Sequence, residues 1–99
     1  MAVIRSSTRF ILGVIIFVFM HFTVYVLYSD TAKKHYTGFT ANLIERLKSH
    51  NELGNEWTAR YRPWRLILQR DFAMKLEAMQ YEKWLKSGQG RAFIKTIPH

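Results

Sequence analysis

One long hydrophobic run dominates the amino-terminal third of the chain. The residues from Phe10 to Tyr28 include no charged side chain, and a helix of that length spans about 28 Å, close to the thickness of the hydrocarbon core of a bilayer. The run is longer than the ~7–15 apolar residues of a secretory signal, and it ends in bulky side chains where a cleaved signal has small ones. The pattern therefore predicts a retained transmembrane helix over residues 10–28.

His21 is the ionisable side chain within this run. Ionisable groups at membrane depth usually face protein, and a haem would need a second histidine at the same depth, which the run lacks. We therefore expect His21 to hydrogen-bond another subunit, with Gly13 about two turns earlier admitting a close neighbouring helix. Tyr25, Tyr28 and Tyr36 fit an aromatic belt at the second membrane interface.

The remainder of the chain has helical periodicity. Leu43 and Leu47 fall on one face of a short amphipathic stretch. Pro63 suits the first position of a helix, and no further Pro or Gly occurs before Gly88. The predicted fold class is all-α. Its segments are a basic N-tail (1–9), a transmembrane helix (10–28), an interfacial connector (29–62) with a short amphipathic helix (42–51), a long extramembrane helix (63–87) and an extended C-terminal tail (88–99).

The predicted helix over residues 63–87 is apolar on more than one side. Trp64, Leu68, Phe72 and Leu76 share one face, and other apolar residues fall on two further sides. A surface helix normally carries a single apolar stripe, and a chain of 99 residues has little structure of its own to cover three. These side chains are therefore predicted to contact other subunits.

The charge of the chain points to an anionic partner. Its 15 Lys and Arg exceed 7 Asp and Glu, for a formal charge of +8, which favours lipid headgroups, nucleic acid or acidic protein surfaces. The densest basic and aromatic cluster contains Arg60, Arg62, Trp64 and Arg65. It suits cardiolipin or another anionic lipid, or an acidic partner, and we expect no nucleic-acid partner.

The sequence carries no recognisable catalytic constellation. A glycine-rich phosphate loop, a His-Glu-x-x-His helix and a nucleophile elbow are all missing. The absence of cysteine excludes disulfides and thiolate chemistry. His35, His50 and His99 are dispersed without the spacing of metal ligands. We therefore expect no enzyme activity, no metal or cofactor site and no small-molecule substrate.

The layout resembles the small single-pass accessory subunits of mitochondrial oxidative-phosphorylation complexes. Residues Trp64–Asp71 (WRLILQRD) are similar to a Trp…Arg-Asp segment that follows the membrane helix in one accessory subunit of the proton-pumping NADH dehydrogenase. The resemblance implies a non-catalytic subunit of a respiratory-chain complex or ATP synthase in the mitochondrial inner membrane. Such a subunit would hold core subunits and lipids together.

Two other interpretations fit the same layout. A membrane assembly factor or anionic-lipid adaptor would have an arm that is soluble alone and binds anionic vesicles in a salt-dependent way. A bitopic envelope protein that forms a coiled coil would need sustained heptads, which residues 63–87 lack.

Overall fold

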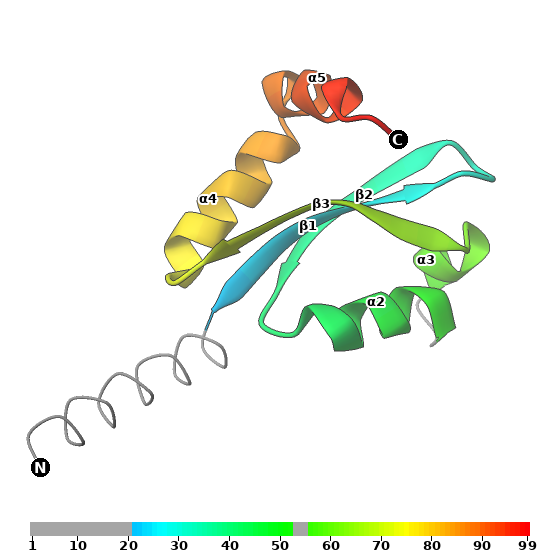
Figure 1. The fold of residues 1–99 in the computed structure, drawn as a ribbon, viewed down its shortest axis with the longest axis horizontal. Coiled ribbons are helices and arrows are strands. Elements are labelled where there is room, and N and C mark those ends of the chain that lie inside the picture. Colours follow the sequence, from blue (N-terminus) through cyan, green and yellow to red (C-terminus); the bar gives the residue numbers. More distant parts are fainter. Residues whose placement is uncertain (1–20, 53–55) are drawn as a thin grey trace, which may run out of the picture.

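A three-stranded antiparallel sheet lies at the centre of the fold in a computed structural model, which describes residues 21–52 and 56–99 (Figure 1). The strand order is β2-β1-β3. Helices α2 and α3 lie on one face of the sheet, and α4 and α5 lie on the other. The elements in chain order are β1 (Phe22–Ser29), β2 (Lys34–Thr40), α2 (Leu43–Glu52), α3 (Glu56–Arg60), β3 (Trp64–Phe72), α4 (Lys75–Leu85) and α5 (Gly88–Thr96).

The central strand β1 is buried on both faces. Val24 and Val26 pack towards α4 and α5 in one apolar cluster, which also contains Ala78, Leu85 and Ile94. Tyr25 and Leu27 point the other way, into a second cluster that contains Trp64. β-Branched and aromatic side chains suit such a strand, and burial on both sides accounts for the unbroken apolar run Val24–Tyr28.

Strand β1 overturns the predicted membrane helix. The second part of the hydrophobic run forms the middle of the sheet, because a strand that is covered on both faces needs the same unbroken apolar sequence as a membrane span. No helix among residues 21–52 and 56–99 has the length and apolar character needed to cross a membrane. Residues 10–20, including Gly13, lie outside the described residues.

Strand β3 overturns the long helix predicted over residues 63–87. It pairs with β1 in antiparallel register, with Val24 opposite Arg70. The register shifts once, between the pairs formed by Val26 and Leu27, which leaves Ile67 as the extra residue of a bulge. Helix propensity is a weak prior that sheet pairing overrides here. The helical part of the segment begins only at Lys75.

The carboxyl-terminal segment is a helix, so the predicted extended tail is also wrong. The Ser87 hydroxyl accepts a hydrogen bond from the Gly90 amide at 3.3 Å and caps α5 at its amino end. Gly90 is buried against α4: a Cβ there would lie 2.1 Å from the Trp84 carbonyl oxygen. Glycine at position 90 therefore permits the close approach of α5 to the end of α4. Mixed α/β architecture replaces the predicted all-α fold, and α2 lies where the short amphipathic helix was expected.

Candidate active site

The site is built around a glycine that faces a buried tyrosine. Gly38 of β2 is paired directly with Tyr25 of β1, and Tyr25 is only 1% exposed. A Cβ at position 38 would lie 2.7 Å from the Tyr25 hydroxyl oxygen and 2.9 Å from its Cζ atom. Glycine is therefore the residue that leaves room for this phenol.

The Tyr25 hydroxyl is joined to a buried histidine. Its oxygen lies 3.1 Å from Nε2 of His50, which is in the last turn of α2 and 2% exposed. Burial raises the pKa of Tyr25, with the neighbouring Tyr36 adding to the rise, so the phenol keeps its proton. Burial and then the charge of Arg46 lower the pKa of His50. Tyr25 and His50 are therefore a neutral hydrogen-bonded pair.

Tyr36 covers this pair on the β2 side. Its ring stacks on Tyr25 with centroids 6.2 Å apart and lies 4.6 Å from the His50 ring. The rings of Trp57 and Trp64 continue the aromatic wall at 5.9 and 6.3 Å. Tyr36 is half-buried, so its ring lies between the buried Tyr25–His50 pair and the surface of the protein.

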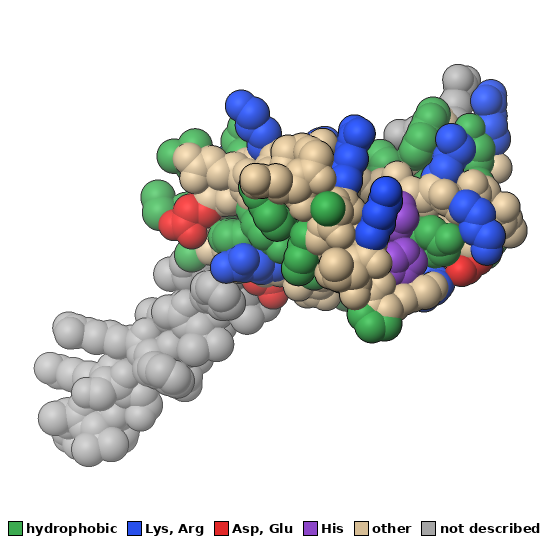
Figure 2. Space-filling view, turned by 90° about the horizontal axis from the view of Figure 1, so that it is seen from above, with side chains coloured by type: hydrophobic (Ala, Val, Ile, Leu, Met, Phe, Trp, Pro, Cys, Tyr) green, Lys and Arg blue, Asp and Glu red, His purple; other side chains and the backbone are tan. Residues whose placement is uncertain are grey.

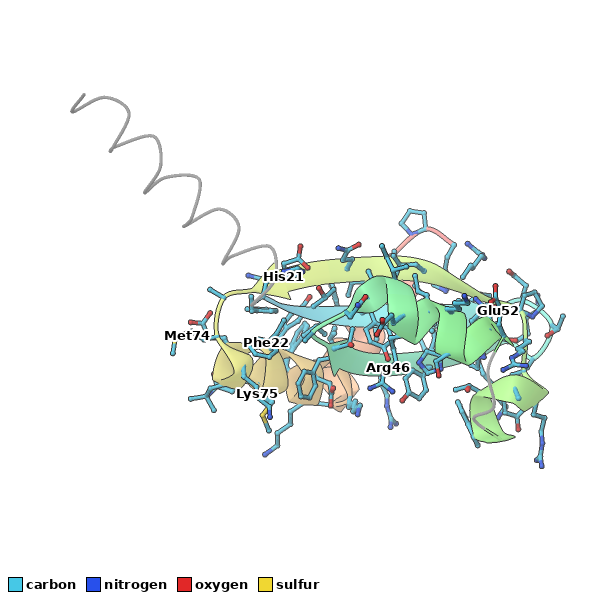
Figure 3. The ribbon with its side chains drawn as sticks, turned by 90° about the horizontal axis from the view of Figure 1, so that it is seen from below. His21, Phe22, Arg46, Glu52, Met74 and Lys75 are labelled. Atoms are coloured by element: carbon cyan, nitrogen blue, oxygen red, sulfur yellow. The ribbon has the colours of Figure 1, made fainter. Side chains whose placement is uncertain are left out.

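Two opposite charges act on the Tyr25 phenol from helices on opposite faces of the sheet. Arg46 is exposed on α2 (Figure 3), and Glu82 lies on α4. The charge of Arg46 lowers the pKa of Tyr25 and the charge of Glu82 raises it, so both lie within electrostatic range of the phenol. The Glu82 side chain is 19% exposed and forms an ion pair with Lys86 at 3.0 Å. The Tyr25 phenol therefore lies within electrostatic range of a guanidinium on α2 and a carboxylate on α4.

Hydrogen bonds from the chain after α2 hold His50 in place. The Arg62 guanidinium donates to the His50 carbonyl oxygen at 2.7 Å. The Asn51 side-chain amide donates to the Trp64 carbonyl at 3.0 Å and accepts from the Trp64 amide at 2.7 Å. The Trp64 indole donates to the Thr58 carbonyl at 2.7 Å. These bonds tie the end of α2 to the start of β3.

The residues that were predicted from sequence to contact partners or lipids lie in different parts of the structure. Arg62 and Trp64 support His50. Leu68 and Phe72 pack on the apolar cluster beneath α4, whereas Arg65 pairs with Asp30 at 2.7 Å. The others are Arg60 and Leu76, which are exposed, His21, which is half-buried, and Gly13, which lies outside the described residues. Whether any of them contacts a partner or a lipid stays a prediction.

Sequence reasoning missed the residues that do converge. It placed Tyr25 and Tyr36 at a membrane interface, took the glycine at 38 as part of a connector, and left His50 among dispersed histidines. The usable signal was the tyrosine pair with a glycine two residues after the second tyrosine. That signal predicts a site only when residues 22–40 are recognised as a hairpin, because the hairpin register places Gly38 opposite Tyr25.

Comparison with known proteins identifies the family to which this chain belongs. Residues 21–93 match the family model of the GIY-YIG catalytic domain. The chain therefore belongs to the GIY-YIG family. Of the two tripeptides in the family name, Tyr36–Gly38 (YTG) keeps the Tyr and Gly of YIG, and Thr23–Tyr25 (TVY) keeps the Tyr of GIY.

Individual relatives agree with this assignment. The chain is 38% identical over 58 residues to a structure-specific endonuclease subunit SLX1 homolog of Giardia intestinalis, covering 54% of this chain and 16% of that protein. It is 42% identical over 52 residues to the UPF0213 protein YazA of Bacillus subtilis, covering 52% of each. A solution NMR structure of the UPF0213 protein BH0048 of Bacillus halodurans is similar with a TM-score of 0.50 and 30% identity, over 78% of this chain and 84% of that one. The chain thus spans about half or less of the length of these two curated relatives.

The family membership corrects the functional predictions made from sequence. The chain is not an accessory subunit of a respiratory complex, nor a membrane assembly factor or lipid adaptor, because its family is defined by a catalytic domain. The expectation of no enzyme activity is wrong for the same reason. The predicted single-pass location in the mitochondrial inner membrane is also wrong, because it depended on a membrane helix whose second part is strand β1. The exclusion of nucleic acid conflicts with a relative that is an endonuclease subunit.

Proposed function

We propose that this chain hydrolyses phosphodiester bonds of nucleic acid at the Gly38 site, defined by Tyr25, Tyr36, Arg46, His50 and Glu82. The observation that supports the proposal best is the buried Tyr25–His50 pair at Gly38, within electrostatic range of Arg46 and Glu82, in a region that matches a catalytic domain. The printed name of the Giardia relative, a structure-specific endonuclease subunit, points to the substrate class.

Arg46 is the group that stabilises charge in this proposal. Cleavage of a phosphodiester concentrates negative charge on the phosphate oxygens in the transition state, and a preorganised guanidinium stabilises that charge. The exposed Arg46 side chain can reach an incoming phosphate, while its charge already acts on Tyr25 and His50.

Tyr25 and His50 supply the proton acceptor. An imidazole must be neutral to accept a proton, and the lowered pKa of His50 keeps its imidazole neutral at pH 7. The raised pKa of Tyr25 disfavours a free phenolate, so the phenol passes its proton to His50 as it takes one from the attacking water. The point where a Cβ would stand on Gly38 is 2.7 Å from the Tyr25 hydroxyl oxygen, which is hydrogen-bonding distance for a water or substrate oxygen.

Glu82 is the side chain that would hold a divalent cation at this site. Among residues 21–52 and 56–99, no group of three or more His, Asp or Glu side chains is placed to hold a metal ion. Mg²⁺ is commonly held by one or two carboxylates together with water and substrate phosphates, and the single acid Glu82 fits that mode. A cation bound there supplies further positive charge for the phosphate oxygens.

Cleavage assays with a matched pair of acids test the proposal. Labelled single strands, blunt duplexes and duplexes with a single-stranded arm, as DNA and as RNA, are incubated with the protein and Mg²⁺ or Mn²⁺. We expect Glu82→Gln to lower the cleavage rate by about 100-fold or more. Glu77→Gln, an exposed acid in the first turn of the same helix, should change it less than about twofold. Failure of the wild-type chain to cleave any of these substrates, or undiminished cleavage by Glu82→Gln, would refute the proposal.

A further inference from the structure

A pair of histidines outside the Gly38 site has no role in the chemistry proposed above. His35 belongs to β2 and His99 follows α5, yet their Nε2 atoms lie 3.0 Å apart. Both side chains are exposed. Figure 2 shows histidine side chains at the surface on the face of the sheet that α5 covers, with Lys and Arg side chains beside them. The fold therefore brings together two imidazoles that are 64 residues apart in the chain.

One tyrosine supports both histidine rings. Tyr28 of β1 is paired with His35 on one side and with Arg65 of β3 on the other. The centroid of the Tyr28 ring lies 4.9 Å from that of the His35 ring and 4.7 Å from that of the His99 ring. Both imidazoles thus pack against the same half-buried phenol, which restricts their rotation.

Arg65 anchors His99 through its main chain. The Arg65 guanidinium donates a hydrogen bond to the main-chain oxygen of His99 and lies 5.4 Å from the centroid of the Tyr28 ring. It also donates two hydrogen bonds to the Asp30 carboxylate, at 2.7 and 3.0 Å. The charge of Asp30 offsets that of Arg65, so this guanidinium adds little repulsion to a cation bound at the histidines.

The hydrogen bonds and the charge state of the two rings suit metal binding. Nδ1 of His99 is hydrogen-bonded to the Ile97 carbonyl oxygen, which can only accept, so Nδ1 carries a proton and Nε2 of the neutral ring has a lone pair. A histidine ligand commonly donates its other ring N–H to a backbone carbonyl in this way. Burial and then the charges of His99 and Lys95 lower the pKa of His35, so His35 is neutral at pH 7, the form that binds a metal.

The separation of the two Nε2 atoms matches that of two imidazole ligands on one metal ion. Bonds of ~2.0–2.1 Å from metal to nitrogen place two ligand atoms about 2.9 Å apart at a right angle and about 3.3 Å apart at the tetrahedral angle. The observed 3.0 Å lies within this range. Among residues 21–52 and 56–99, no third His, Asp or Glu joins the pair in a group that could hold a metal ion, so water would complete the coordination.

We propose that His35 and His99 bind a divalent transition-metal ion of the Zn²⁺, Ni²⁺ and Cu²⁺ class through their Nε2 atoms, and that the ion ties the end of α5 to β2. Imidazole suits these ions, whereas Mg²⁺ prefers oxygen ligands. The site is therefore separate from the cation position at Glu82, and it does not rest on the proposed nuclease function. Because the two ligands come from distant segments, the folded chain presents the site and the unfolded chain does not, so binding stabilises the fold.

Titration calorimetry with Zn²⁺ at neutral pH, on the chain without a histidine tag, tests the proposal. We expect one tight site in the wild type. His35→Gln and His99→Gln should each weaken binding by about 100-fold or more, because the second, intramolecular contact is lost. His21→Gln removes a histidine outside the pair, and Glu82→Gln removes the acid proposed to hold the catalytic cation. Both of these controls should bind Zn²⁺ as the wild type does.

Thermal unfolding gives a second measurement on the same variants. With free Zn²⁺ at ten times its dissociation constant, the midpoint of the wild type should rise by about 5–10 °C. The rise should disappear in His35→Gln and in His99→Gln, and the same concentration of Mg²⁺ should cause no rise that depends on the pair. Absence of Zn²⁺ binding by the wild type, binding that survives both histidine substitutions, or binding that is lost in Glu82→Gln would overturn the proposal.

Discussion

Adding one methyl group at Gly38 should destabilise the fold as well as disable the site. The new Cβ would lie 2.7 Å from the Tyr25 hydroxyl oxygen, 2.9 Å from its Cζ atom and 3.2 Å from Cε1 of Tyr36. Tyr25 is 1% exposed and hydrogen-bonded to His50, so its ring has no free space to move into. Overpacking of this kind costs ~1–3 kcal/mol. Alanine also restricts the unfolded chain, which offsets ~0.4–1 kcal/mol of that cost.

We therefore expect Gly38→Ala to lower the free energy of unfolding by about 1–2 kcal/mol. Each kcal/mol lost should lower the midpoint of thermal unfolding by ~4–8 °C. Urea unfolding followed by tryptophan fluorescence measures it. Gly88→Ala is the matched control, because a Cβ at that position meets no atom within 4 Å. In a Tyr25→Phe background the cost of Gly38→Ala should shrink, since the nearest clashing atom is gone. The same stability for Gly38→Ala and Gly88→Ala would show that the close approach to Tyr25 has no energetic consequence.

The remaining predictions concern α5 and the buried histidine. Gly90→Ala places a Cβ 2.1 Å from the Trp84 carbonyl oxygen, so it should destabilise the chain more than Gly38→Ala does and raise amide hydrogen exchange throughout α5; exchange equal to the wild type would contradict the close packing. Burial lowers the pKa of His50 below its ordinary 6.5, so its contribution to stability is complete above pH 6.5 and is lost as pH falls from there through the folded-state pKa. His50→Gln should therefore flatten the fall in unfolding free energy as the pH is lowered from 6.5, and an unchanged slope would show that His50 is not buried as a neutral group.

Sequence alone located α2 because its cues are local. Leu43 and Leu47 recur at helical spacing, and the Asn42 side chain accepts a hydrogen bond from the Glu45 amide at 3.1 Å in the first turn. β1 and β3 lack such cues. A strand covered on both faces and a membrane helix share one apolar pattern, and the Leu, Gln and Arg residues of β3 favour helix when pairing is ignored. The choice between these structures depends on strand partners distant in the sequence.

The Gly38 site was hidden for the same reason. Tyr25 and His50 are 25 residues apart in the chain, and Glu82 comes from a helix on the opposite face of the sheet. No short motif contains these residues together, so searching for local catalytic patterns found none. The hairpin register pairs Tyr25 with Gly38, and a Cβ at position 38 would clash with the Tyr25 ring, which explains the glycine. The basic character of the chain did indicate an anionic partner, but it could not distinguish lipid from nucleic acid.

The rate of cleavage by Arg46→Gln under single-turnover conditions tests the central claim most directly. With the best cleaved of the labelled substrates in excess enzyme and Mg²⁺, the wild-type chain should yield discrete products. Loss of the guanidinium should slow that step by about 10²–10³-fold. Lys48→Gln, which removes a positive charge from an exposed position on the same helix, should stay within about threefold of wild type. Equal rates for Arg46→Gln and Lys48→Gln would show that the Gly38 site does not carry the reaction.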